Sequence, residues 1–181
     1  MITKNWIVKI DRITSNFKNE FGELTPEQLN LKPDENTWSI AQNIEHLIIV
    51  NESYFPVINA AKESKYKAPF ISKFDFVINS LGKFILNSVQ PDRKRKTKTF
   101  PMWKPSLSVI GNDILEKFEK HQSALKEMID GSKDIFGKRI VISSPANRYV
   151  VYTLDTAFNI IIAHEERHFE QAKELLPIVK R

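Results

Sequence analysis

The 181-residue chain is 41% hydrophobic and 27% charged, a balance typical of a folded globular protein, and its length suits one domain over residues 1–181. The absence of cysteine excludes disulfides, thiolate ligands and cysteine nucleophiles, so a metal would have to be held by His, Asp or Glu. The formal net charge of +5 reflects one cluster at residues 93–98, because the rest of the chain balances 22 basic against 22 acidic residues.

The N-terminal quarter predicts a long amphipathic helix followed by a short one. The first is expected over residues 2–20, with Gly22 ending it. Thr25 is placed to cap a short helix over residues 26–30, in which Pro26 takes the first helical position. The apolar positions that define the first helix are Trp6, Ile10, Ile13 and Phe17.

A second long helix is expected to begin after Ser39. Ser39 and Gln42 have the spacing of a capping box, in which the two side chains satisfy free backbone N–H groups. Pro56 lies inside the apolar pattern and lacks an N–H. We therefore expect a kink there, with the helix continuing towards Ser64.

The middle of the chain gives a weaker signal. Residues 73–89 have helical periodicity but also accommodate a short extended segment. The basic cluster at 93–98 and the prolines Pro101 and Pro105 then predict a loop. Nearby aromatic residues make a nucleic-acid contact conceivable, but a single local cluster favours a solvated loop, and we expect no nucleic-acid partner.

Two further long helices are predicted in the second half. The third starts near Leu107 and ends at Gly131. Residues 132–147 predict a loop, within which residues 139–142 favour an extended segment. The fourth helix is expected over residues 148–179.

Four amphipathic helices with few strand signals predict an all-α four-helix bundle. The two long connections, between the second and third and between the third and fourth helices, permit a crossover topology. The N-terminus lacks the continuous apolar segment of a signal peptide, and no apolar run approaches the ~20 residues of a membrane span. We expect a cytoplasmic protein that does not contact a membrane.

The segment HEERHFEQ near the C-terminus carries the first candidate metal ligands. His164 and His168 are four residues apart and continue an apolar stripe that includes Ile161, so both are expected to face the bundle core. Two imidazoles one helical turn apart can bind the same ion. Such a pair alone is weak support for a metal site, because histidines on helices are often only hydrogen-bonded.

His46 is the candidate third ligand. It lies beside the apolar face of the second helix, and the neighbouring side chains Gln42, Asn43 and Glu45 offer hydrogen-bond partners for an imidazole. His121 lies in a charged stretch of the third helix, and we interpret it as a surface or structural residue.

Two segments resemble the DinB-like superfamily, in particular its bacillithiol-transferase-like branch. They are LTPEQLNLKPDENTWSIAQNIEHLIIVNESYF, which begins at Leu24, and TLDTAFNIIIAHEERHFEQAKEL, which begins at Thr153. The strongest parts of the match are WSIAQNIEHL and HEERHFEQ, and together the motifs cover about a quarter of the chain.

The resemblance implies an up-down-down-up four-helix bundle in which three histidines hold a divalent metal, usually zinc or nickel. These ligands correspond to His46, His164 and His168, all of which are present. Trp38 matches a tryptophan of the family that we interpret as a packing residue. The resemblance also implies a homodimer.

Three functions follow from a three-histidine site with an open coordination position. Relatives in the family transfer small thiols such as bacillithiol to electrophiles, which makes an S-transferase with a thiol cosubstrate the favoured expectation. A metal-dependent hydrolase that uses water is the alternative, and a non-catalytic metal-binding bundle is the third. Glu45 and Glu165 are the candidate catalytic carboxylates, as general base or metal-associated groups.

Overall fold

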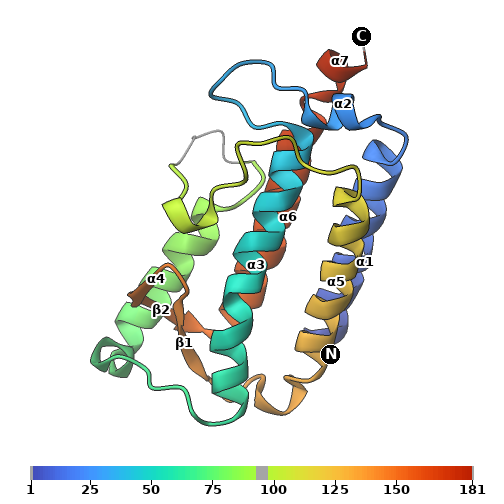
Figure 1. Ribbon diagram of the computed structural model, residues 1–181. Coiled ribbons are helices and arrows are strands. Elements are labelled where there is room, and N and C mark those ends of the chain that lie inside the picture. Colours follow the sequence, from blue (N-terminus) through green and yellow to red (C-terminus); the bar gives the residue numbers. More distant parts are fainter. Residues whose placement is uncertain (1, 93–97, 181) are drawn as a thin grey trace.

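The computed structural model describes residues 2–92 and 98–180, which form a four-helix bundle with a smaller layer at one side (Figure 1). In the view of Figure 1, α1 and α6 run upward while α3 and α5 run downward, which confirms the all-α fold and its up-down-down-up order. Each of α1 and α3 packs against both α5 and α6. The bundle helices are α1 (Ile2–Phe21), α3 (Ile40–Lys62), α5 (Ile114–Asp130) and α6 (Leu154–Lys173).

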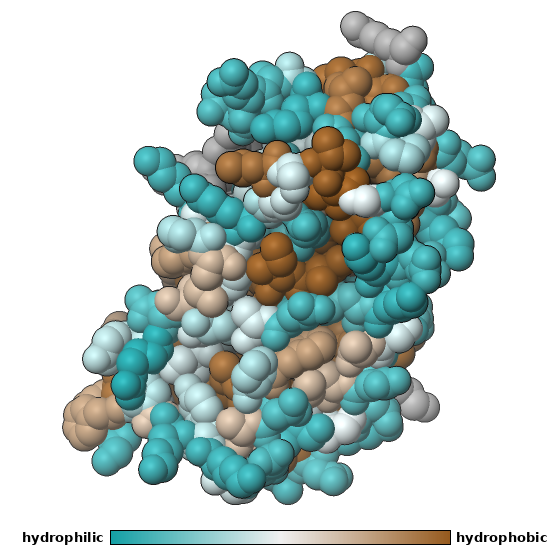
Figure 2. Space-filling view, in the orientation of Figure 1, coloured by the Kyte–Doolittle hydropathy of each residue, from teal (hydrophilic) through white to brown (hydrophobic). Residues whose placement is uncertain are grey.

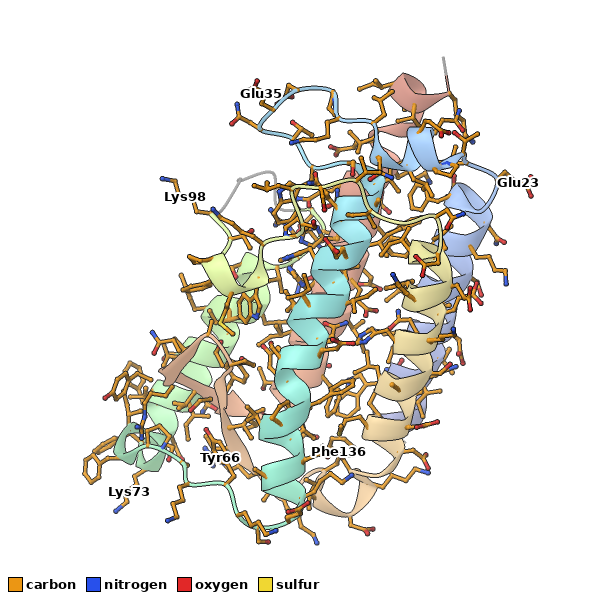
Figure 3. The ribbon with its side chains drawn as sticks, viewed as in Figure 1. Glu23, Glu35, Tyr66, Lys73, Lys98 and Phe136 are labelled. Carbon is orange, nitrogen blue, oxygen red and sulfur yellow. The ribbon has the colours of Figure 1, made fainter. Side chains whose placement is uncertain are left out.

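Aromatic side chains from three helices fill one part of the core. The ring of Phe17 on α1 lies 4.7 Å from that of Phe118 on α5 and 5.2 Å from that of Phe169 on α6. At the lower end of the bundle, Phe136 packs edge-on against Trp6, with ring centroids 4.9 Å apart (Figure 3). These contacts account for the apolar stripes, because each helix buries the face that carries them.

The predicted helix starts and ends of the first half are confirmed. Thr25 caps α2 (Pro26–Asn30) and Ser39 caps α3, and each cap forms a complete capping box. Helix α3 continues through Pro56 to Lys62, close to the expected end near Ser64. Hydrogen bonds of the capping box therefore define the residue at which α3 begins, and the first turns of this helix carry His46.

A side layer covers α6. It consists of α4 (Asp75–Ser88), which packs against an antiparallel hairpin of β1 (Val141–Ser144) and β2 (Asn147–Thr153) and against α6. The sequence left residues 73–89 open between helix and extended structure, and they are mostly helical. The extended segment expected within residues 132–147 is confirmed as β1. Figure 3 places Tyr66 beside this hairpin, where its hydroxyl donates a hydrogen bond to Ser143 Oγ at 2.7 Å.

The predicted start of the fourth helix at residue 148 is wrong, because residues 147–153 form β2 and α6 begins at Leu154. The run from Tyr149 to Tyr152 is rich in β-branched and aromatic side chains, which favour a strand. Thr153 then caps α6 by accepting a hydrogen bond from the Thr156 backbone N–H. At the other end, α6 stops at Lys173 and a separate short helix, α7 (Leu176–Val179), follows.

The predicted start of the third helix near Leu107 is also wrong, because α5 begins at Ile114. Leu107 and Val109 lie in the preceding loop with exposures of 97% and 82%, whereas Ile110 is buried there. Pro105 and Gly111 flank this apolar segment and disfavour a helix. Short 3-10 helices occupy Phe70–Lys73 (η1), Pro101–Trp103 (η2) and Lys133–Ile135 (η3).

Two further expectations concern membrane-spanning helices and the basic cluster at residues 93–98. Among residues 2–92 and 98–180, no helix combines the length and hydrophobicity needed to cross a bilayer. Residues 93–97 of the predicted basic loop lie outside the described residues, so this loop stays a prediction.

Valine at position 82 is expected to destabilise the protein by about 1–3 kcal/mol, the usual cost of overpacking. A Cβ atom on Gly82 would lie 3.1 Å from both Thr156 Cγ2 and Tyr152 Cβ, where α4 meets the hairpin and α6. Urea denaturation of Gly82→Val measures the cost. Ser80→Val is the matched control, since Ser80 is exposed on the same helix. Equal stability of the two variants would contradict close packing of α4.

Candidate metal centre

Three histidine rings from α3 and α6 converge at one point in the upper half of the bundle. The His164 Nε2 atom lies 3.4 Å from His46 Nε2 and 3.1 Å from His168 Nε2. One ring nitrogen of each histidine lies within 4.8 Å of a ring nitrogen of both others, and all three side chains are largely buried. The structure therefore brings together the three residues that sequence analysis proposed as ligands.

Hydrogen bonds on the far side of two rings fix which nitrogen carries the proton. His46 Nδ1 lies 2.6 Å from the Trp103 carbonyl oxygen, and His168 Nδ1 lies 2.8 Å from Asn43 Oδ1. Both partners are acceptors, so both Nδ1 atoms must be protonated. The Asn43 amide cannot be turned around without loss, because its Nδ2 donates to the Ser39 carbonyl at 2.9 Å.

This arrangement leaves too few protons at the centre of the cluster. In their neutral forms His46 and His168 each point an Nε2 lone pair towards His164 Nε2, which can carry one proton at most. A single proton on His164 Nε2 can be donated to one of the two lone pairs and leaves the other lone pair without a hydrogen-bond donor. A cation accepts all three lone pairs at once, so the donor set fits a divalent metal.

Burial keeps the three imidazoles in the neutral form that ligates metals. Desolvation lowers the pKa of His46 to about 4 and takes the pKa of His164 and of His168 well below its usual range. The buried guanidinium of Arg167 lowers the last two pKa values further. Its Nη1 donates to the backbone carbonyls of Ser88 and Gln90, which holds the side chain next to the histidines.

Trp38 packs against the cluster, as predicted. Its ring centroid lies 4.8 Å from that of His46, and it stacks on His168 at 5.9 Å with an interplanar angle of 22°. The residue precedes the Ser39 cap, so the same turn that starts α3 also places an apolar wall beside two of the histidines.

Glu165 faces away from the three histidines into a second buried polar cluster. Asn51 Nδ2 donates to its Oε1 at 2.7 Å, and Gln122 Nε2 donates to its Oε2 at 3.0 Å. Burial raises the pKa of Glu165 to about 7, although these two hydrogen bonds oppose the shift. One turn of α6 thus presents His164 to one side and the Glu165 carboxyl group to another.

His121 belongs to this second cluster. The interpretation of His121 as a surface residue is wrong, because its side chain is only 2% exposed, but a structural role agrees with its contacts. Asn51 Nδ2 lies 3.2 Å from His121 Nε2, and Phe55 stacks on the ring. The charged residues around His121 in the sequence lie on the outer face of α5, whereas His121 lies on the buried inner face.

Glu45 lies on another flank of α3. Its Oε2 accepts a hydrogen bond from the Ser106 backbone N–H at 2.6 Å, and the Gln42 side chain donates to the Ser106 carbonyl at 2.8 Å. Together they fasten the loop before α5 to the start of α3. The polar neighbours of His46 in the sequence therefore serve different partners, and among them only Asn43 bonds to an imidazole.

Two groups at the site were not identified from the sequence. The Trp103 carbonyl at the end of η2 orients His46, but a backbone acceptor has no side-chain signature in the sequence. Arg167 did have a signal in the sequence, because it lies within the HEERH motif three residues after His164. In the structure its side chain is buried.

Comparison with known proteins supports one assignment. A sequence model described as the DinB superfamily matches residues 9–172, which include α3 and α5 and most of α1 and α6. Searches of curated proteins and of solved structures each found no match to the chain. The match covers both histidine-bearing segments and agrees with the bundle topology, and the chain therefore belongs to the DinB superfamily.

Proposed function

We propose that the protein is a divalent-metal-dependent enzyme whose ion is held by His46, His164 and His168, and that it transfers a small thiol to an electrophile. Zinc and nickel are the proposed metals, and a bacillithiol-type thiol is the proposed cosubstrate. The observation that carries the proposal is the convergence of the three Nε2 atoms. In His46 and His168 the ring proton is held on Nδ1, which leaves Nε2 free to bind an ion. Membership of a metal-dependent superfamily supports the same assignment.

The chain's own residues would prepare the site before any substrate arrives. The Trp103 carbonyl and Asn43 orient two imidazoles and keep their Nε2 atoms unprotonated. Trp38 shields the cluster from water on one side, and the Arg167 guanidinium adds positive potential that favours an anionic ligand. A divalent ion held there would supply Lewis acidity, lowering the pKa of a thiol or of water.

The positions of the two candidate carboxylates favour a thiol over water. Glu45 is bonded to the loop before α5, and Glu165 is bonded to Asn51 and Gln122 inside the bundle. Hydrolysis commonly needs a group that takes a proton from water, whereas a thiol with its lower pKa ionises readily beside a cation. A site without either carboxylate beside the histidines is better suited to the thiol.

Activity assays distinguish these reactions. Tag-free protein loaded with zinc or nickel would be incubated with bacillithiol, cysteine or glutathione and a chromogenic electrophile, and separately with ester and amide substrates. We expect metal-dependent consumption of thiol with formation of a thioether. Ester or amide cleavage without thiol transfer would favour the hydrolase, and neither activity across the panel would favour a non-catalytic metal-binding bundle.

Replacing Asn43 with alanine is expected to weaken metal binding by about 10–100-fold, the usual cost of removing a group that orients a ligand. The change removes the acceptor for His168 Nδ1–H and leaves the three imidazoles in place. Competition with a fluorescent chelator measures the affinity. Asn59→Ala is the matched control, since Asn59 is exposed further along the same helix. Unchanged affinity in Asn43→Ala would show that this hydrogen bond does not support the site.

A further inference from the structure

The outer face of α4 carries large apolar side chains that the rest of the protein does not cover. All 14 residues of α4 are described, and among them only Ile78 and Gly82 are buried. Phe76 and Phe84 are 80% and 66% exposed, and both lie on the side of the helix opposite Gly82, which packs on the hairpin and α6. A helix with apolar residues on its outer face as well as its inner face is typical of a surface that binds a partner.

Two more aromatic side chains extend this surface around the start of α4. Phe70 in η1 and Phe74, which precedes α4, are 70% and 50% exposed, and their ring centroids lie 5.6 Å apart. Figure 2 shows apolar side chains at the lower left corner of the molecule, where Figure 1 places η1 and the start of α4. This corner projects from the four-helix bundle. We call these four residues, Phe70, Phe74, Phe76 and Phe84, the aromatic surface.

Basic side chains lie next to the aromatic surface. Lys83 is seven residues after Phe76 and is therefore on the same face of α4. The Lys73 Nζ atom lies 5.0 Å from the centroid of the Phe70 ring.

Apart from the basic cluster at 93–98, positive charge is concentrated in this part of the protein. Residues 66–92 and 138–153 contain η1, α4, the hairpin and their flanking residues, and they hold six basic and two acidic side chains. The remaining residues outside the basic cluster hold 16 basic and 20 acidic side chains. The side layer and η1 therefore attract an anionic partner more than the bundle does.

A small cavity beside η1 has the donors that recognise a phosphate. Its volume is about 300 Å³, and Ser64, Ser72 and Arg139 are among the residues that line it. Ser72 belongs to η1, so the cavity adjoins the aromatic surface. A guanidinium and hydroxyl groups donate well to phosphate oxygens. Arg139 pairs with Asp75 at 2.7 Å, but both side chains are exposed, and such pairs are weak and can be exchanged.

We propose that the side layer docks on an anionic phospholipid bilayer, with the aromatic surface between headgroups and acyl chains and a headgroup phosphate at Arg139. Apolar rings flanked by lysines are the combination that binds the interface of an anionic membrane. The expectation that the protein does not contact a membrane was based on the lack of a signal peptide and of a spanning segment, and a surface contact requires neither. A nucleic acid fits less well, because single strands bind in grooves, whereas this corner projects from the bundle.

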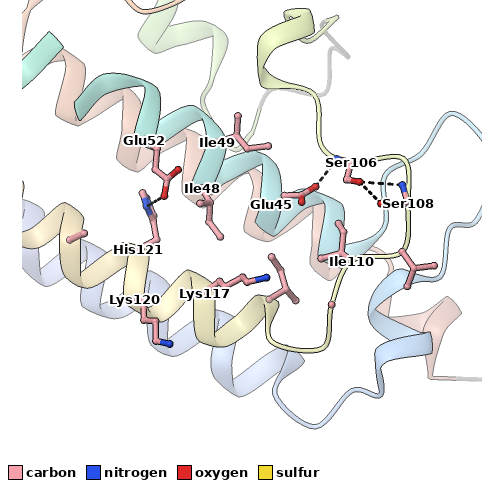
Figure 4. A pocket seen from close by; sticks show the side chains of 14 residues that line it. Glu45, Ile48, Ile49, Glu52, Ser106, Ser108, Ile110, Lys117, Lys120 and His121 are labelled. Carbon is pink, nitrogen blue, oxygen red and sulfur yellow. Dashed lines mark hydrogen bonds and ion pairs between the residues drawn. The ribbon is translucent and has the colours of Figure 1, made fainter. Parts of the chain in front are cut away.

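The surroundings of a second exposed apolar site do not select an anionic partner. Val109 is 82% exposed and lines a groove of about 570 Å³ between α3 and α5 (Figure 4). Glu45 and Glu52 line the groove from α3, whereas Lys117 and Lys120 line it from α5. Charges of both signs give no net attraction to an anionic bilayer. Val109 is therefore a matched control for exposed apolar area alone.

Vesicle sedimentation tests the aromatic surface. The wild type should bind vesicles with one third phosphatidylglycerol at least about tenfold more tightly than vesicles of phosphatidylcholine alone, and high salt should weaken this binding. The double variant Phe76→Ser/Phe84→Ser should bind anionic vesicles at least about tenfold more weakly, because two rings no longer enter the interface. It keeps every basic residue, including the cluster at 93–98, so a loss of charge cannot cause the effect. Val109→Ser should bind as the wild type does.

Two further variants test the headgroup site. Arg139→Gln should weaken binding to anionic vesicles about fivefold, as expected of one basic residue at an anionic surface. Asp75→Asn breaks the same ion pair but keeps the guanidinium, so it should not weaken binding. Soluble glycerol phosphate should not displace the protein from vesicles, because it offers no apolar interface.

Four results would overturn the proposal. The first is a wild type that does not bind anionic vesicles, whether or not it binds single-stranded nucleic acid or associates with itself through this surface. The second is tight binding by the double variant, which would assign the contact to basic charge alone. The third is an equal loss in Arg139→Gln and Asp75→Asn, and the fourth is displacement by glycerol phosphate. Circular dichroism and metal content should be unchanged in every variant, so the test is independent of the fold and of the proposed enzymatic function.

Discussion

Replacing His164 with alanine is expected to lower the affinity for zinc and for nickel by more than about 100-fold, beyond the cost of removing a group that merely orients a ligand. His164 is the residue whose Nε2 contacts the Nε2 atoms of both other histidines. Without His164, only two candidate ligand atoms remain, one from His46 on α3 and one from His168 on α6. Two imidazoles rarely hold a divalent ion against chelators.

Isothermal titration with tag-free protein measures this effect directly. The wild type should bind one ion per chain, and at 100 times the Kd the bound metal should stabilise the fold by about 2.7 kcal/mol. His121→Gln is the matched control, because His121 is the one histidine outside the cluster and the substitution keeps a polar side chain beside Asn51. Equal affinity of wild type and His164→Ala would contradict the proposed ligand set.

Glutamine at position 165 is expected to stabilise the metal-free protein by up to about 3 kcal/mol at pH 8. Burial raises the pKa of Glu165 from 4.5 to about 7, and a tenfold change in an acid dissociation constant corresponds to about 1.4 kcal/mol. The new amide can keep both hydrogen bonds, because Gln122 Oε1 has no hydrogen-bond partner among residues 2–92 and 98–180 and the Gln122 side chain can turn to present it. The buried charge is removed and the network is retained.

The sign of this effect depends on pH. A carboxyl group with a raised folded-state pKa favours the folded state below pH 4.5, and this contribution is lost as pH rises through about 7. The stability difference between Glu165→Gln and wild type should therefore grow between pH 5 and pH 8. Urea denaturation of chelator-treated protein across this range measures it. A difference that does not change with pH would mean that Glu165 stays ionised in the fold.

Sequence analysis predicted the bundle and the three histidines that converge in it well, because both rest on helical periodicity. The spacing of His164 and His168 places them on one face of any helix, whatever its exact start. The capping boxes at Thr25 and Ser39 depend on local hydrogen bonds, which is why these helix starts were placed correctly.

The errors arose where tertiary packing overrides local pattern. Residues 148–153 continue the apolar pattern of α6, but they pair with β1 and pack against α4, which only the folded chain reveals. The apolar loop that holds Leu107 and Val109 has helical spacing without a helix. His121 looks like a surface residue in a charged stretch, and its burial follows from the rotation of α5 in the bundle.

The orientation of the site could not be predicted for a related reason. His46 is held by the carbonyl of Trp103, 57 residues away at the end of η2, whose position follows from its contacts with α3. Asn43 was identified as a partner for an imidazole, but it bonds to His168 rather than to its neighbour His46. The candidate ligands can be chosen from local sequence, whereas the orientation of their rings is a property of the packed bundle.

The most direct test of the metal centre is anomalous diffraction from crystals loaded separately with zinc and with nickel. The proposed site predicts one strong peak about 2.0–2.1 Å from the Nε2 atoms of His46, His164 and His168. A map without a peak among these three residues, or with the metal held elsewhere in the chain, would contradict it.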